Sequence, residues 1–248
     1  ARGVLNANGT GNASEVIAGY DDPTPGVGDK INANGGNDTV WAKAGQDTVE
    51  GGKGNDFLHG GDGNDTITDA QGDDLLWGDA GNDSLNGGDG NDVITSDGDG
   101  GTYRGDGGND TLFSGLGPET MDGGAGTDTI DHTAWGGNYV FNMATGLTDF
   151  GSESYINFEN ANMGAGNDSV TGNASANIIN GGAGSDTLEG GFGQDTLTGG
   201  AGNDFFRLTE VSLPCPSPAS RDLITDFSVA DDTIILANSL DSTLVGLI

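Results

Sequence analysis

Aspartate recurs every nine residues along most of this chain, and its carboxylates are the side chains best suited to shared chemistry. Counting from Ala33, residues 33–131 divide into eleven nine-residue units without insertion or deletion, and residues 163–207 give five more. A short carboxylate in a turn can bind nearby backbone or share a cation with a neighbour, so the pattern predicts cation binding. The sixth-position aspartates are Asp38, Asp47, Asp56, Asp65, Asp74, Asp83, Asp92, Asp110, Asp128, Asp168, Asp186, Asp195 and Asp204.

The charge balance also indicates cation binding. The 248 residues include 39 acidic and 7 basic side chains, a formal charge of −32, and most of the acids are aspartate. Such a chain cannot neutralise phosphates, so nucleic acid is excluded as a partner. A highly acidic sequence can also be a disordered, self-repelling polymer, but a strict period favours a repeated folded unit.

Each unit combines a six-residue glycine-rich turn with a three-residue strand. The eighth position is apolar in every unit, and side chains alternate along a strand, so position eight points inward while positions seven and nine point outward. Two units then form one coil of 18 residues with a strand on each side. The predicted fold is all-β, a parallel β-roll (β-solenoid) in two stacked blocks.

Apolar burial alone cannot hold such a fold. Each coil buries only two apolar side chains, which offsets little of the entropy lost on ordering 18 residues. Stacked aspartates would destabilise it further by repulsion, and a divalent cation reverses that effect. Calcium suits a flexible cage of carboxylates and carbonyls, whereas magnesium demands a stricter octahedron.

The units resemble the nonapeptide GGxGxDxUx of RTX (hemolysin-type) calcium-binding proteins, where U is a large apolar residue. This resemblance implies that each ion lies between turns one coil apart, held by two sixth-position aspartates and by carbonyls of the glycine turns. It implies about eight to eleven Ca²⁺ ions. The turn glycines concerned are Gly36, Gly45, Gly54, Gly63, Gly72, Gly81, Gly90, Gly108, Gly126, Gly166, Gly184, Gly193 and Gly202.

Residues 18 apart should therefore pair, which predicts two rows of sites in the first block. One row, Asp38 to Asp128, continues without a gap and predicts five good sites. The other, Asp29, Asp47, Asp65 and Asp83, meets Gly101 and Glu119, so we expect two or three sites and failure past Asp83. In the second block we expect ions at Asp168–Asp186 and Asp186–Asp204, and a weaker one at Asn177–Asp195.

The chain then divides into five segments. We assign 1–32 to an N-terminal cap with a degenerate repeat, 33–131 to the first block and 132–162 to an insert with strands near 139–143 and 155–159. Residues 163–207 form the second block, and 208–248 resemble the C-terminal cap of RTX proteins, close to their type I secretion signal. A repeat stack needs such caps at its open ends. The single cysteine, Cys215, allows no intrachain disulfide, and no apolar run predicts a transmembrane span.

The outward positions of one predicted sheet are too apolar to be left bare. Two interpretations are open: other segments of this chain cover the face, or it docks another domain, a surface protein or a glycan, with aromatic anchors. The residues of this possible docking face are Trp41, Phe57, His59, Leu75, Trp77 and Phe113.

No HExxH zinc motif, GxSxG elbow or phosphate loop occurs, so we expect no enzyme activity in this chain. The leading expectation is a secreted, calcium-binding protein of the cell surface that serves in architecture or adhesion, as part of a larger chain or assembly. The alternative is the C-terminal folding and secretion module of an exported metalloprotease, lipase or alginate epimerase. In both cases the chain folds on extracellular calcium.

Overall fold

The computed structural model describes residues 6–11, 13–20, 27–97, 99–115, 117–208 and 221–236, and these residues form strands, turns and bends. The chain divides into two compact units: Ala1–His132 with Phe150–Phe158, and Thr133–Asp149 with Glu159–Ile248. None of the described residues belongs to a helix that could span a membrane.

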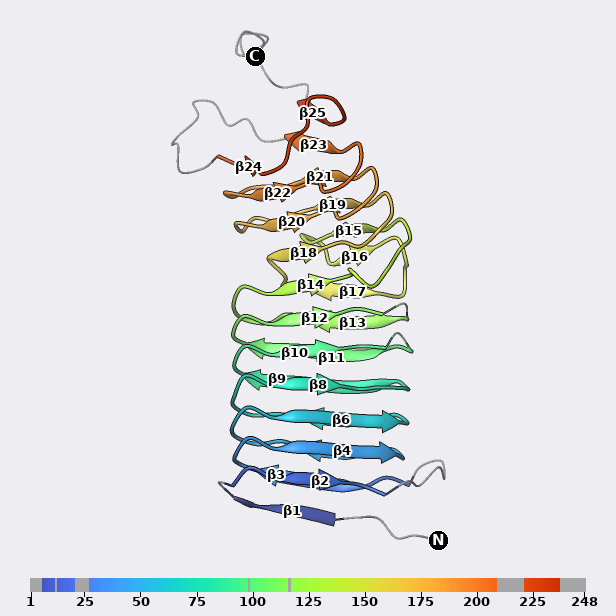
Figure 1. Cartoon of the computed structure of the whole chain (residues 1–248), viewed down its shortest axis with the longest axis vertical. Coiled ribbons are helices and arrows are strands. Elements are labelled where there is room, and N and C mark those ends of the chain that lie inside the picture. Colours follow the sequence, from blue (N-terminus) through green and yellow to red (C-terminus); the bar gives the residue numbers. More distant parts are fainter. Residues whose placement is uncertain are drawn as a thin grey trace. The chain divides into compact units, whose positions relative to one another are not determined.

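Unit 1 consists of two parallel sheets whose strands follow one another alternately along the chain (Figure 1). The first sheet, sheet A, has the order β1-β3-β5-β7-β9-β11-β13-β17, and sheet B has the order β2-β4-β6-β8-β10-β12-β14 within this unit. The strands of sheet A are β1 (Asn6–Gly11), β3 (Lys30–Asn34), β5 (Thr48–Glu50), β7 (Thr66–Thr68), β9 (Asp83–Asp89), β11 (Gly101–Gly107), β13 (Glu119–Asp122) and β17 (Ser154–Ile156). Those of sheet B are β2 (Val16–Ala18), β4 (Thr39–Ala44), β6 (Phe57–Asp62), β8 (Leu75–Trp77), β10 (Val93–Thr95), β12 (Thr111–Phe113) and β14 (Thr129–Asp131).

From β3 to β13 in sheet A and from β4 to β14 in sheet B, the register between neighbouring strands is 18 residues, as the nine-residue period predicts. Ile94, for example, pairs with Leu76 on one side and with Leu112 on the other. A strand therefore hydrogen-bonds to the strand one full coil away, and two nonapeptides make one coil. The predicted parallel β-roll is confirmed.

The core of unit 1 from β4 to β14 is a column with one large apolar side chain from each strand. The eighth-position residues are at most 1% exposed, while the residues beside them, except the buried Asp131, are half-buried or exposed. The column comprises Val40, Val49, Leu58, Ile67, Leu76, Leu85, Ile94, Tyr103, Leu112, Met121 and Ile130.

The turns are also joined from coil to coil, through the fifth position of each unit. The Asn55 backbone N–H donates to Oδ1 of Asn37 at 3.1 Å, and the Asn109 N–H donates to Oδ1 of Asn91 at 2.9 Å. This ladder satisfies backbone donors that the short strands cannot reach, so turns and strands stack with the same spacing.

Unit 2 repeats the arrangement with two further sets of strands. One set has the order β18-β20-β22-β24, and the other has the order β16-β15-β19-β21-β23-β25. The strands pair in parallel within these sets, except in the β15–β16 hairpin, which is antiparallel. The strands are β15 (Val140–Asn142), β16 (Leu147–Thr148), β18 (Asn160–Asn162), β19 (Ser169–Thr171), β20 (Ile178–Asn180), β21 (Thr187–Glu189), β22 (Thr196–Thr198), β23 (Phe205–Leu208), β24 (Leu223–Ile224) and β25 (Thr233–Leu236).

The segment predicted as an insert contributes strands to both units. Its strands β15, β16 and β18 belong to unit 2, whereas β17 belongs to unit 1 and extends sheet A beside β13. After the last nonapeptide, β24 pairs with β22 and β25 pairs with β23, so the C-terminal segment adds a strand to each set. Cys215 and residues 237–248 lie outside the described residues.

Two adjacent glycines give a test of this stacking. At Gly108 φ is +143°, and a Cβ would lie 1.6 Å from the Gly90 carbonyl oxygen one coil away. At Gly107 the nearest atom to a Cβ would be 3.7 Å away. We expect Gly108→Ala to lower the free energy of unfolding by at least about 2 kcal/mol, because the backbone is left-handed and the carbonyl cannot move.

Gly107→Ala is the matched control and should change stability by only about 0.5 kcal/mol. Both variants are compared with the parent chain by denaturant unfolding at saturating calcium. Equal stability of the two variants would contradict the close stacking of the turns.

Candidate metal-binding rows

The sixth-position aspartates of unit 1 form two rows, one in the turns from sheet A to sheet B and one in the turns back. In the first row the aspartates are at most 2% exposed. From Asp56 onward, each Oδ1 accepts the backbone N–H of the aspartate one coil earlier: Asp56 accepts from Asp38 at 2.7 Å, and Asp92 accepts from Asp74 at 2.8 Å. The row is thus tied together along its length by identical hydrogen bonds.

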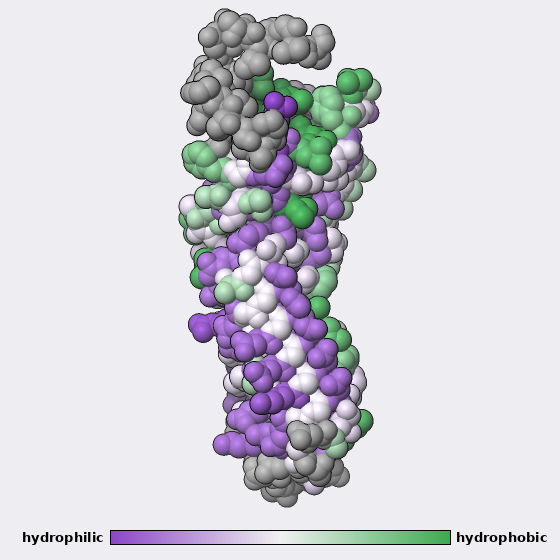
Figure 2. All heavy atoms as spheres, turned by 90° about the vertical axis from the view of Figure 1, so that its left-hand side faces the viewer, coloured by the Kyte–Doolittle hydropathy of each residue, from purple (hydrophilic) through white to green (hydrophobic). Residues whose placement is uncertain are grey.

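The other oxygen of these carboxylates is buried without a hydrogen-bond donor. This holds for Oδ2 of Asp38, Asp56, Asp74, Asp92 and Asp110 in the first row. A buried carboxylate oxygen without a partner is strongly unfavourable in a low-dielectric environment. The fit to a hard divalent cation is therefore good, because a row of oxygen acceptors lacks only the positive charge. Figure 2 looks onto this side of the molecule, where a pale band runs along the turns of unit 1 between hydrophilic side chains.

The first position of each unit explains why there is room for these carboxylates. A Cβ on Gly87 would lie 2.2 Å from Oδ2 of Asp92, the sixth-position aspartate of the same unit. The same conflict occurs at Gly105 with Asp110. Glycine at position one therefore leaves the space that the carboxylate occupies.

The predicted carbonyl ligands lie on the same turns. The thirteen turn glycines named above all have φ between +123° and +157°. The Gly54 carbonyl oxygen lies 1.6 Å, and Oδ1 of Asp74 lies 3.1 Å, from the point where a Cβ on Gly72 would be. A fourth-position carbonyl and a sixth-position carboxylate from successive coils therefore lie beside the same glycine.

Burial makes these carboxylates weak acids in the metal-free fold. The pKa of Asp56, Asp74 and Asp92 is raised from 3.8 to about 7, mainly by loss of hydration and to a smaller extent by neighbouring carboxylates. The hydrogen bond from the preceding backbone N–H acts in the opposite direction. Burial and the neighbouring carboxylates thus both disfavour the ionised form of these aspartates.

The second row follows the same pattern as far as Asp83. Oδ1 of Asp65 accepts the Asp47 N–H at 2.7 Å, and Oδ1 of Asp83 accepts the Asp65 N–H at 2.8 Å. At the next coil Gly101 stands in the sixth position, and a Cβ there would lie 2.7 Å from the Tyr103 hydroxyl. That hydroxyl donates to the Gly100 carbonyl at 2.9 Å, so a phenol lies beside the position where the row would have its next carboxylate.

Glu119 ends this row with hydrogen bonds from the protein itself. Its carboxylate is fully buried and accepts from the hydroxyls of Ser96 and Ser114. The Ser114 hydroxyl also lies 2.8 Å from the Tyr155 hydroxyl. Burial raises the pKa of Glu119, and the two serine hydroxyls oppose that shift. This end of the row is therefore compensated by hydroxyl donors, in contrast to the aspartates before it.

Unit 2 has two shorter rows. In one, Oδ1 of Asp186 accepts the Asp168 N–H at 2.8 Å and Oδ1 of Asp204 accepts the Asp186 N–H at 2.9 Å. In the other, Asn177 donates its amide to the Glu159 carbonyl and to Asn173 Oδ1, so its side chain is satisfied by neutral partners.

Sequence spacing missed two continuations of these rows. Oδ1 of Asp222 accepts the Asp195 N–H at 3.1 Å, and Oδ1 of Asp232 accepts the Asp204 N–H at 3.0 Å. Their separations from the preceding aspartate, 27 and 28 residues, lie outside the 18-residue coil. Their Oδ1 atoms nevertheless accept the same kind of backbone N–H hydrogen bond that links the aspartates within the rows.

A further acidic residue was also missed. Asp69 stands at position one, where the neighbouring coils of the first row have glycine, and it is 4% exposed. Its departure from the repeat was visible in the sequence, but only the structure shows that position one faces inward.

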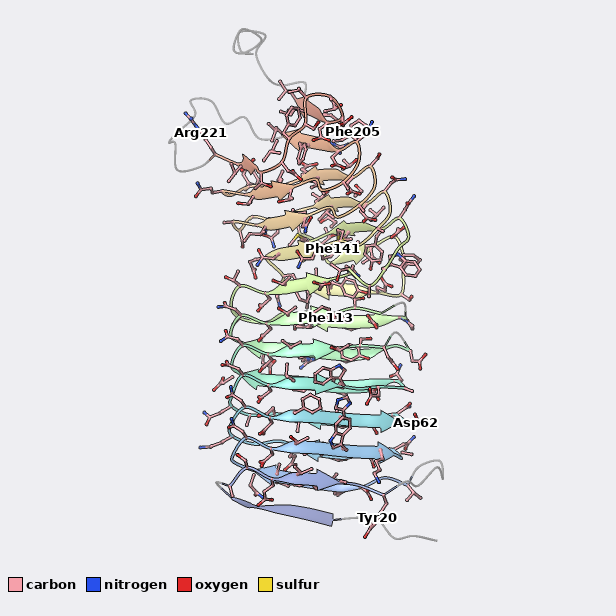
Figure 3. All side chains as sticks on the ribbon, in the orientation of Figure 1. Tyr20, Asp62, Phe113, Phe141, Phe205 and Arg221 are labelled. Atoms are coloured by element: carbon pink, nitrogen blue, oxygen red, sulfur yellow. The ribbon has the colours of Figure 1, made fainter. Side chains whose placement is uncertain are left out.

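The predicted docking face lies on the outer side of sheet B (Figure 3). His59 stacks between Trp41 and Trp77, with ring centroids 4.2 Å and 4.8 Å away, and its Nδ1 is 2.7 Å from Asp79 Oδ2. Phe57 packs against all three rings. Trp41 remains 43% exposed and Leu75 37%.

Phe113 does not join this aromatic cluster. It pairs in register with Thr95 of β10, and Thr95 in turn pairs with Trp77. A threonine on the intervening strand therefore separates Phe113 from the stacked rings.

The comparisons with known proteins agree with the geometry of the rows. The RTX calcium-binding nonapeptide repeat family matches residues 32–67, 59–94, 68–103, 95–130, 164–188 and 180–208. These matches cover more than half of the chain and include both predicted blocks. A search of curated proteins returned no match.

The raised pKa values predict an unusual pH dependence. In the metal-free fold the pKa is about 7 for Asp56, Asp65 and Asp74, against about 3.9 in an unfolded chain. The folded state therefore holds these protons more tightly, and the resulting stability is fully present below about pH 4 and lost as the pH rises through about 7. We expect calcium-free protein to gain β-structure when the pH falls from 8 to 5.

With calcium present the pH dependence of stability reverses, so that stability falls as the pH falls, because protons and calcium compete for the same oxygens. Both effects are measured by far-ultraviolet circular dichroism after chelation and desalting, with added sodium chloride at pH 8 as a control for simple screening. Calcium-free protein that shows no gain at pH 5 would contradict the buried, mutually repelling rows.

Proposed function

Because the chain belongs to the RTX calcium-binding nonapeptide repeat family, we propose that it is a secreted module that folds on extracellular calcium. Its role is in cell-surface structure or adhesion. The observation that carries the proposal is the buried, donorless oxygen on each aspartate of the first row from Asp38 to Asp110. Such rows suit a chain that is unfolded where calcium is scarce and folded where it is abundant.

The residues that would hold the ions are the sixth-position aspartates and the fourth-position carbonyls described above. Bound calcium would supply positive charge to these carboxylates and so replace their repulsion with attraction. The chain's own contribution is positional: Oδ1 is fixed by a backbone N–H, and Oδ2 is left free to bind. Ligand binding to the folded state alone shifts the folding equilibrium toward it.

The calcium concentration decides whether the chain is folded or unfolded. Extracellular calcium modules have dissociation constants of about 0.1–1 mM, well above the calcium concentration inside cells. The chain therefore stays unfolded during synthesis, a state that can be threaded through an export channel, and folds outside. We place its site of action outside the cell on this argument.

The alternative role uses the same mechanism. The chain would be the calcium-dependent folding and secretion module of an exported metalloprotease, lipase or alginate epimerase, and would have no catalytic activity of its own. The full-length coding sequence discriminates between the two roles: an additional hydrolase or HExxH domain favours the carrier, whereas assembly on a cell surface favours the first role.

The central test is a calcium titration of the metal-free chain at neutral pH. We expect little β-structure without calcium and a cooperative gain as calcium approaches about 1 mM, with magnesium at equal concentration giving much less. Circular dichroism and hydrodynamic radius report the change. Full β-structure after exhaustive EGTA treatment at pH 8 would refute calcium-dependent folding.

The surface role depends on the aromatic face of sheet B. Trp77→Ser removes the ring that stacks on His59 and packs against Phe57, contacts that contribute about 1 kcal/mol or less. We expect the variant to melt within a few degrees of the parent chain at saturating calcium but to lose attachment to cells.

Thr68→Ser on the outer face of sheet A is the control and should affect neither property. A large drop in melting temperature with attachment retained would mean instead that another segment of this chain covers the face.

A further inference from the structure

One turn of the first row has an acidic side chain where its neighbours have none. Position one is Gly51, Gly87 and Gly105 in three of these turns, and it is Asp69 in the turn that ends at Asp74. The Asp69 side chain is 4% exposed, so its charge points into the fold. This departure from the repeat requires a compensating partner.

Three carboxylates converge at this turn. Ligand oxygens of Asp56, Asp69 and Asp74 all lie within 4.8 Å of one another, and no other group of three metal-ligating side chains this close occurs among the described residues. Asp56 and Asp74 belong to successive coils of the first row, so Asp69 adds a third negative charge to an expected two-aspartate site.

Each of the three has a buried oxygen with no hydrogen-bond partner, namely its Oδ2. Oδ1 of Asp69 accepts the N–H groups of Ala70 and Gln71, at 2.5 Å and 3.2 Å, which fixes the carboxylate in its turn. Its Oδ2 is then directed toward Gly51 of the preceding coil, where a Cβ would be only 1.9 Å away. A Cβ on Gly51 would also lie 2.8 Å from Asp56 Oδ2, so the two free oxygens meet at one place.

We infer that Asp56, Asp69 and Asp74 form one calcium site that is tighter than the other sites of the first row and fills first. The inference rests on the calcium binding proposed for the rows. Affinity in oxygen-ligand calcium sites rises with the number of charged ligands and with rigidity. Here both are greater than in the neighbouring turns, because Asp69 adds charge and its Oδ1 is held by two N–H groups.

A purely structural role for Asp69 makes a different prediction. If Asp69 served only to bind the Ala70 and Gln71 N–H groups, asparagine would replace it, since an amide oxygen accepts the same hydrogen bonds. Asp69→Asn therefore removes the charge and keeps the turn.

The experiment is a calcium titration of the whole chain by isothermal titration calorimetry at pH 7.5 or above, starting from metal-free protein. For the parent chain we expect one ion to bind at least about tenfold more tightly than the rest. Asp69→Asn should weaken that ion about tenfold or more and leave the remaining sites unchanged. Asp89→Asn, which removes an exposed carboxylate from the turn of the next coil, is the matched control and should keep the tight ion.

Asp69→Gly, which restores the usual residue at position one, gives a second variant in case the asparagine variant folds poorly. Equal titrations for the parent and both Asp69 variants would overturn the inference and leave calcium-dependent folding intact. A parent chain that binds no calcium would overturn the proposed function as well, so the two failures are distinguishable.

Discussion

The buried carboxylate row is the constraint on which the rest of this structure depends. In the first row from Asp38 to Asp110, each coil buries an aspartate, fixes one of its oxygens with a backbone N–H and leaves the other without a donor. From β4 to β14 each strand buries only one large apolar side chain, which is too little to compensate for that charge. A bound cation or a proton would remove that charge and so stabilise the stack.

Regular repetition makes much of this predictable without coordinates. Once the period is nine and two units make a coil, counting alone places Leu76 between Leu58 and Ile94, and places Asp74 next to Asp56 and Asp92. The same counting locates the end of the second row at Gly101 and Glu119. In a repeat fold, sequence separation is nearly a spatial coordinate, because each unit contacts mainly its neighbours.

The features that counting missed are those where the period or the residue class changes. Asp222 and Asp232 continue the rows of unit 2 at separations of 27 and 28 residues, which no fixed period identifies. Tyr103 belongs to the apolar column by position, yet its hydroxyl lies beside the site of the missing carboxylate at Gly101. The effect of such a residue depends on its neighbours in the folded turn, so a single repeat considered alone does not reveal it.

Position one is where the chain sets the electrostatics of each turn. Glycine leaves room for a carboxylate that needs a cation, as at Gly87 beside Asp92. Serine instead supplies a hydroxyl donor, and Ser96 and Ser114 together satisfy Glu119. Aspartate does the opposite and adds charge, as Asp69 does beside Asp74. The backbone is nearly the same in all three cases, since the strands from β6 to β14 keep one 18-residue register in sheet B. The carboxylate charge that a cation would have to neutralise therefore varies along a uniform backbone. It is greatest near Asp69 and least near Glu119, where serine hydroxyls of the protein donate hydrogen bonds. A change among glycine, serine and aspartate at position one can therefore change the electrostatics of a turn without altering the fold.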